Sequence, residues 1–186
     1  MSTSTVAPEV TGTYAIDPTH SRIGFVARHA MVTKVRGSFN EFTGTGFFDP
    51  ADPAQTHLAL TIEAASIDTR NADRDAHLRS NDFFDMENHP QITFTSTAVE
   101  STGPETLAVT GDLTIKGVTQ PVTVEFTYEG AATDPYGNHR IGFEGTATVN
   151  RKDWGVNFNA PLEAGGILIS EKVTLEFEVS AIRQEA

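Results

Sequence analysis

The chain contains no cysteine among its 186 residues. This absence excludes a disulfide scaffold, a thiolate zinc site, an iron–sulfur cluster and a cysteine nucleophile. Basic residues are also scarce, with 13 Lys and Arg against 25 Asp and Glu, which gives a formal net charge of −12. Such a charge repels a nucleic-acid backbone and an anionic membrane surface. We therefore expect neither a nucleic-acid partner nor membrane insertion.

Targeting and membrane-spanning segments are lacking as well. The first ten residues, MSTSTVAPEV, have neither the basic region nor the apolar region of a secretory signal. No stretch approaches the roughly 20 apolar residues of a transmembrane helix. We expect a cytoplasmic protein with a flexible, Ser/Thr-rich lead-in over residues 1–12 and a single domain over residues 13–183, a length that suits one hydrophobic core.

Strand-like alternation of apolar and polar residues dominates the rest of the chain. Clean alternation occurs over 58–62, 107–115, 122–128, 141–149 and 173–179, and less clean alternation over 21–29 and 91–99. A glycine-broken stretch, 35–48, predicts a curved or bulged strand. About eight strands with short links indicate an all-β fold, either an antiparallel barrel or a sandwich, because a parallel sheet would need helical crossovers.

One segment departs from this alternation. Residues 69–86 include Asn71, a suitable N-cap, and Asp73, whose charge favours the first turn of a helix. The pattern predicts one short helix near residues 71–80, ending near Ser80.

An eight-stranded barrel has an interior that is either filled by side chains or holds one elongated ligand. Phenylalanines mixed with glycines on the inward face favour an apolar ligand. Plain core packing is the alternative for each individual side chain. The candidate channel residues are Ile23, Phe25, Phe39, Phe42, Ile62, Phe83, Phe84, Phe94, Leu113, Phe126, Phe143, Trp154, Phe158 and Phe177.

An acidic protein that binds a polar head group must concentrate donors locally. The candidates are Arg28, His29, Arg74, His77 and Arg151. For the helical segment a second interpretation is open and favoured: Arg74 with Asp75, and Asp73 with His77, form local ion pairs that hold the helix in place.

Motifs for catalysis and metal binding are missing. The sequence has no His-x-His or His-Glu-x-x-His spacing, no Gly-x-Ser-x-Gly, no P-loop and no dinucleotide fingerprint. His20 and Ser21 are neighbours on an expected strand, so their side chains point to opposite faces. We expect no enzyme activity, no metal and no cofactor.

A succession of short motifs runs along the chain from about Tyr14 to about Ala181. These are YAIDPTHS (14–21), GSF (37–39), SIDT (66–69), DFFD (82–85), HPQITF (89–94), GDLTIKGVT (111–119) and RKDWG (151–155). In content and order they resemble the YceI-like family of polyisoprenoid-binding proteins.

This resemblance implies an extended, lipocalin-like, eight-stranded antiparallel β-barrel with a long apolar channel. It implies non-enzymatic binding, sequestration or transport of a long amphipathic lipid, such as a prenyl diphosphate, a quinone precursor or a fatty-acid amide. It also suggests a homodimer, and many relatives are periplasmic, unlike the compartment expected above. Two alternatives are a stress-response protein acting through protein contacts and an enzyme that uses His29 or His77 on the bound lipid.

Overall fold

The computed structural model describes residues 8–160, 162 and 168–184. This part of the chain contains eleven strands: β1 (Gly12–Ile16), β2 (Arg22–His29), β3 (Thr33–Phe39), β4 (Phe42–Phe48), β5 (His57–Glu63), β6 (Ile67–Asp68), β7 (Gln91–Ser101), β8 (Thr106–Ile115), β9 (Val118–Thr133), β10 (His139–Asn150) and β11 (Lys172–Arg183). Its one α-helix is α1 (Ala72–Arg79). The short 3₁₀ helices are Pro8–Val10, Pro18–His20, Pro53–Gln55, Ala64–Ser66 and Arg151–Trp154.

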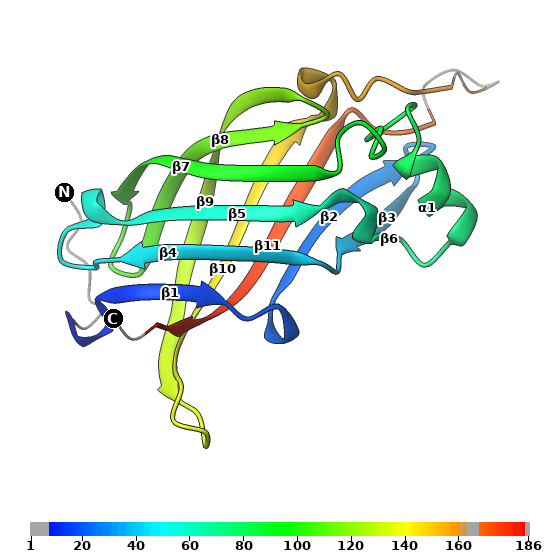
Figure 1. Ribbon diagram of the computed structural model, residues 1–186. Helices are drawn as coiled ribbons and strands as arrows, with labels where there is room; N and C mark the ends of the chain where they lie inside the picture. The colour runs from blue at the N-terminus through cyan, green and yellow to red at the C-terminus, as the bar shows by residue number, and fades with distance from the viewer. Residues whose placement is uncertain (1–7, 161, 163–167, 185–186) are drawn as a thin grey trace.

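Eight of these strands close into an antiparallel barrel. Their order is β1-β4-β5-β7-β8-β9-β10-β11, and β1 pairs with β11 to complete the ring. One edge of β11 serves two strands in succession, since residues 181–183 pair with β1 and residues 174–178 pair with β2. β3 and β6 continue outward from β2. The result is an elongated barrel with α1 at one end and β1 toward the other (Figure 1).

The predicted fold class and helix are both confirmed. α1 lies within the predicted segment 71–80, and the Asn71 side chain accepts a hydrogen bond from the Arg74 backbone N–H at 2.9 Å. Residues 1–7 of the predicted lead-in lie outside the described residues. In its remaining part, the Val10 carbonyl accepts a hydrogen bond from the Tyr14 hydroxyl at 2.6 Å, which ties this part of the lead-in to β1. The domain boundaries stay a prediction.

The glycine-broken stretch 35–48 forms two strands instead of one curved strand. The break falls between β3 and β4, where the chain changes partners: the Asn40 N–H donates to the Ser66 carbonyl and the Glu41 carbonyl accepts from the Glu63 N–H. Beyond the break, β4 pairs with β5, whereas β3 pairs with β2. The break therefore coincides with the hydrogen bonds of these two residues, and the glycines lie within the strands.

Several inward-facing phenylalanines lie flat against glycines on the neighbouring strand. A Cβ atom built at Gly37 would lie closer than 3.0 Å to ring atoms of Phe25, its cross-strand partner. Gly145 and its partner Phe126 have the same relation. The rings therefore follow the barrel wall, which leaves space along the middle of the barrel.

A substitution at Gly37 tests this arrangement. Because its Cβ would collide with the Phe25 ring, Gly37→Ala is expected to lower the free energy of unfolding by about 1–3 kcal/mol, the usual range for overpacking. The matched control is Gly142→Ala, where the nearest atom to the new Cβ is 3.7 Å away. Urea denaturation of both variants measures the difference, and equal stability would contradict the close approach.

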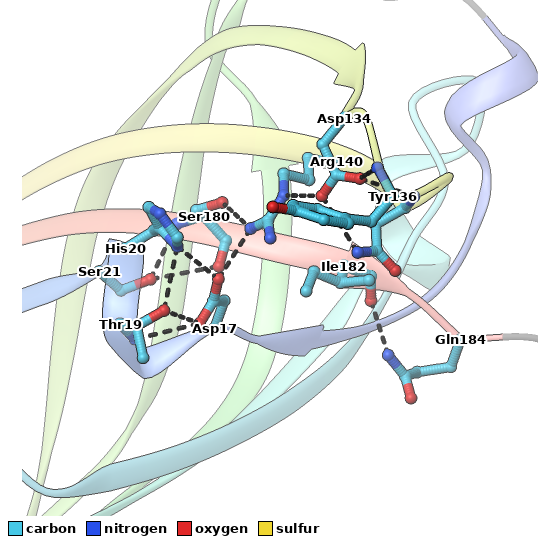
Figure 2. A network of polar contacts seen from close by, with 11 residues as sticks. Asp17, Thr19, His20, Ser21, Asp134, Tyr136, Arg140, Ser180, Ile182 and Gln184 are labelled. Carbon is cyan, nitrogen blue, oxygen red and sulfur yellow. Dashed lines mark hydrogen bonds and ion pairs between the residues drawn. The ribbon is translucent and has the colours of Figure 1, made fainter.

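The first motif of the sequence forms part of a polar network on the barrel wall (Figure 2). Arg140 donates from Nη1 to Asp17 Oδ2 and from Nε to Asp134 Oδ2, both at 2.8 Å. This Arg140 clamp joins the connection between β1 and β2 to the β9–β10 hairpin. Asp17 also accepts from the Thr19 N–H at 3.0 Å, and the Ser21 hydroxyl accepts from the Ser180 N–H at 2.9 Å.

The clamp makes stability depend on pH. The hydrogen bonds from Arg140 hold the pKa of Asp17 and of Asp134 well below the usual carboxyl range. A lowered folded-state pKa stabilises the protein above the unfolded carboxyl pKa of about 4, and this contribution is lost as the pH falls below that value. Arg140→Gln is therefore expected to destabilise the protein at pH 7 more than at pH 3, as measured by denaturation at both values. An equal loss at both pH values would contradict the role of the clamp.

Candidate functional site

The interior of the barrel holds an apolar cavity at the α1 end, called cavity 1 here. It has a volume of about 150 Å³, and Leu78, Phe83 and Phe84 bring α1 and the turn after it into its wall. Arg151 is the one charged side chain among its described lining residues. An apolar cavity of this size in another protein stays dry and binds benzene, so cavity 1 is large enough for a short stretch of hydrocarbon.

A second apolar cavity, cavity 2, lies toward the other end of the barrel. Its volume is about 100 Å³, and Tyr14 and Ile141 are among its lining residues. The two cavities share no lining residue among those described, but Val109 of cavity 2 pairs directly with Val124 of cavity 1. The layer of side chains between the two cavities therefore includes neighbouring residues of β8 and β9.

Strand β11 lines both cavities along its inward face. Val173, Leu175 and Phe177 line cavity 1, and Val179 lines cavity 2. All four are only half-buried, although they face the inside of the barrel. Side chains that border an internal space are expected to keep part of their surface accessible, and these four do.

The fourteen channel residues expected from sequence fall into three sets. Ten line cavity 1: Ile23, Phe25, Phe39, Ile62, Phe83, Phe84, Phe94, Leu113, Trp154 and Phe177. Phe126 and Phe143 line cavity 2. Phe42 is buried outside both cavities, and Phe158 packs its ring on His77 and Phe83 at centroid distances of 4.7 and 5.2 Å.

Other wall residues escaped the sequence reasoning. Val122, Val124 and Leu175 line cavity 1. Each has the inward parity of its strand, so alternation alone could have identified them. In these two strands the candidate residues were only the phenylalanines, Phe126 and Phe177.

Arg151 is the one head-group candidate that lies in the wall of a cavity. It is buried, and it donates to the carbonyls of Ser170, Val156 and Ile169 at 2.9, 2.7 and 3.3 Å. Burial lowers its pKa, and the nearby charge of Glu171 opposes that effect. Three of the five guanidinium N–H groups are thus used by backbone carbonyls, and the side chain holds the segment after β10 against the barrel.

Trp154, the chain's single tryptophan, lies beside this segment. It is 2% exposed, lines cavity 1 and donates from Nε1 to the Leu113 carbonyl at 2.8 Å. Its emission therefore reports on the contents of cavity 1.

His77 and Arg74 lie on α1 and serve different neighbours. His77 Nε2 lies 2.8 Å from Asp82 Oδ2, and its ring packs edge-on against Phe83. Arg74 donates to the Thr69 carbonyl at 2.6 Å, and the carboxylate of Asp75 accepts from the Thr69 N–H at 2.9 Å.

The structure does not form the local ion pairs expected within the helix, Arg74 with Asp75 and Asp73 with His77. Contacts with residues outside the helix take their place. The reason is geometric: Arg74 and Asp75 both turn back to Thr69, three residues before the helix begins, and the partner of His77 comes from the turn after the helix.

The remaining head-group candidates, Arg28 and His29, lie at the end of β2. His29 lines a surface hollow that also includes Arg74. The five predicted polar residues are thus divided: Arg151 lies in the wall of cavity 1, His77 packs on aromatic rings, and Arg28, His29 and Arg74 lie at the β2–β3 hairpin and the hollow beside it.

Over the described ranges, no group of three or more His, Asp or Glu side chains is placed to hold a metal ion. The one described helix is too short and too polar to cross a membrane. The chemistry that the interior offers is burial of apolar groups, with a single guanidinium at its edge.

Comparison with known proteins places this fold in a recognised group. A family model described as the YceI-like domain matches residues 14–181. Protein YceI of Escherichia coli O157:H7 is 40% identical over 178 residues, which is 95% of this chain and 90% of that protein.

Two solved structures are also similar. Burkholderia cenocepacia BcnA has a TM-score of 0.79 and 28% identity, covering 89% of this chain and 98% of its own. A polyisoprenoid binding domain from Saccharophagus degradans, implicated in plant cell wall breakdown, has a TM-score of 0.69 and 16% identity, covering 92% and 98% of the two chains. At that identity the second similarity concerns the fold alone.

Proposed function

This chain belongs to the YceI-like domain family, and on that premise we propose that it binds a long apolar ligand inside the barrel, without chemical conversion. The ligand class that fits best is a polyisoprenoid, such as a prenyl diphosphate or a quinone precursor. The observation that carries the proposal is cavity 1, whose described wall is apolar except for Arg151. A polar ligand would find almost no partner for its donors and acceptors there.

The apolar tail supplies most of the binding free energy in this proposal. Burial contributes about 0.8 kcal/mol for each CH₂-sized group, or up to about 4 kcal/mol for a five-carbon isoprene unit, before the costs of association. A tail longer than cavity 1 extends into cavity 2 when the layer between them moves. The rings of Phe126 and Phe177, with centroids 5.8 Å apart, belong to that layer.

We further propose that the protein carries or sequesters its ligand and that it needs no metal or cofactor. A cytoplasmic location and a homodimer stay predictions.

Trp154 provides the test. Titration with a fatty acid that carries a nitroxide in mid-chain should quench its emission saturably, at one ligand per chain, and geranylgeraniol should reverse the quenching by competition. Saturation at one ligand per chain and reversal by geranylgeraniol distinguish a ligand in cavity 1, which Trp154 lines, from nitroxide spread over the outer surface. Quenching no stronger than that of free tryptophan at the same nitroxide concentration would contradict the proposal.

A further inference from the structure

The β2–β3 hairpin carries a charge opposite to that of the whole protein. From Ser21 to Asn40 the sequence has no Asp or Glu and four basic residues, in a chain of net charge −12. Three of these, Arg28, Lys34 and Arg36, lie on the half of the hairpin near its tip. The hairpin is therefore a basic element on an acidic protein.

The tip of this hairpin exposes apolar side chains. Met31 is 54% exposed and Val32 is 75% exposed, and the only other large apolar residue so exposed in the described ranges is Tyr136. Ala30 and Met31 both have positive φ, at 51° and 62°, which makes the reversal tight. Two adjacent apolar side chains thus project into solvent beside the basic residues.

Next to the tip is a surface hollow of about 430 Å³. It lies along Thr33–Arg36 of β3, which have no strand partner on this side among the described residues, because β6 pairs only with Ser38 and Phe39. None of its described wall residues is acidic; they are His29, Thr33, Lys34, Val35, Arg36, Thr69, Arg70 and Arg74.

Most of the cations in this hollow are free to take an anion. In the described part of the chain, Lys34, Arg36 and Arg70 form no ion pair. All three side chains are exposed. Guanidinium groups match the oxygens of a phosphate with two parallel hydrogen bonds.

We propose that the β2–β3 hairpin and this hollow form a docking surface for an anionic phospholipid membrane. Met31 and Val32 enter the interfacial layer of the bilayer, and the hollow takes lipid phosphates. The two features lie side by side, since His29 and Thr33 of the hollow flank the tip directly in sequence. An exposed apolar tip next to unpaired cations suits a membrane surface better than it suits a soluble anion, which would gain nothing from the tip.

The net charge of −12 does not prevent this docking. Charges in water are screened beyond about 8 Å at physiological ionic strength, so the membrane responds mainly to the groups at the docking surface. The total charge alone predicts repulsion from a membrane, but the four Lys and Arg side chains of the hollow are gathered in one place on the surface.

Docking would also place the membrane beside cavity 1. Ala27 of the cavity wall pairs with Val35 of the hollow, and His29 forms a bridge with Ile169, another residue of that wall. Lipid transfer by this route rests on the proposed function, whereas docking itself does not.

Vesicle flotation tests the proposal. The full-length protein should float with vesicles of phosphatidylcholine containing phosphatidylglycerol, and not with pure phosphatidylcholine, and added salt should weaken the binding. Lys34→Glu combined with Arg36→Glu should lower the partition coefficient at least tenfold. Met31→Ser combined with Val32→Ser should lower it several-fold.

Two matched controls accompany these variants. Arg22→Glu reverses one basic charge, half the change of the double variant, about 23 Å along β2 from His29, at about 3.3 Å per residue. Tyr136→Ser removes an exposed apolar side chain from the β9–β10 hairpin. Both controls should bind vesicles like the unchanged protein. Nitroxide quenching of Trp154 in every variant checks the barrel separately, so failure of docking and failure of the proposed function are distinguishable.

Three outcomes would overturn the proposal. One is no binding to the anionic vesicles, and another is an equal loss in the hollow variants and the controls. The third outcome combines two results. Inorganic pyrophosphate binds saturably and Lys34→Glu with Arg36→Glu abolishes this binding, while Met31→Ser with Val32→Ser leaves vesicle binding unchanged. That result would assign the hollow to a free anion.

Discussion

Val149→Trp is expected to reduce the affinity for a long apolar ligand by roughly a hundredfold or more, while the protein stays folded. Val149 is a half-buried residue of β10 that lines cavity 1, and its cross-strand partner Val173 lines it too. An indole ring placed there fills much of a cavity of about 150 Å³. New apolar contacts inside the cavity offset part of the strain, so we expect the free energy of unfolding to change by no more than about 1–3 kcal/mol.

The matched variant is Val179→Trp, which makes the same change in cavity 2. Competition with radiolabelled geranylgeraniol measures both affinities. Loss in both variants indicates a ligand that extends through the whole interior, and loss in Val149→Trp alone indicates one that ends in cavity 1. Unchanged affinity in Val149→Trp would contradict binding in cavity 1.

Arg151→Leu is expected to produce the largest loss of stability, about 3–5 kcal/mol in the free energy of unfolding. The substitution leaves the carbonyls of Ser170, Val156 and Ile169 without their donor. Two of these hydrogen bonds are buried, where an unpaired acceptor costs about 1–3 kcal/mol. A leucine cannot replace any of these bonds.

Chemical denaturation measures this loss, with Lys152→Leu as the control. Lys152 is the next residue, and its ion pair with Glu171, at 2.8 Å, is exposed on both sides. A pair this exposed contributes little to stability, so the control should be nearly neutral. A similar loss in both variants would contradict the role assigned to Arg151.

Alternation predicted most of the barrel because its inward faces are strongly apolar. Residues 173–179 illustrate this, since the apolar residue at every second position of this part of β11 lines a cavity. β1, with five residues, and β6, with two, are too short to give a periodic signal. Their pairing depends on partners distant in sequence, which local patterns do not encode.

For the candidate site, too, local patterns predicted the inward-facing wall residues and missed the contacts between distant segments. Strand parity places Phe25 and Phe177 on the inner wall, and both line cavity 1. The partners of Arg151 come from residues 156–170, and nothing in the sequence links them to its side chain. The basic hollow joins 33–36 to 69–74, so its composition appears only once the chain is folded.

Native mass spectrometry of the freshly purified protein, followed by denaturation and solvent extraction, is the most direct test of ligand binding in the barrel. We expect a stoichiometric adduct with a long hydrocarbon chain, or its formation when a prenyl compound is added, and its absence in Val149→Trp. The bare polypeptide mass, with no uptake of prenyl or fatty-acyl compounds, would contradict ligand binding in the barrel.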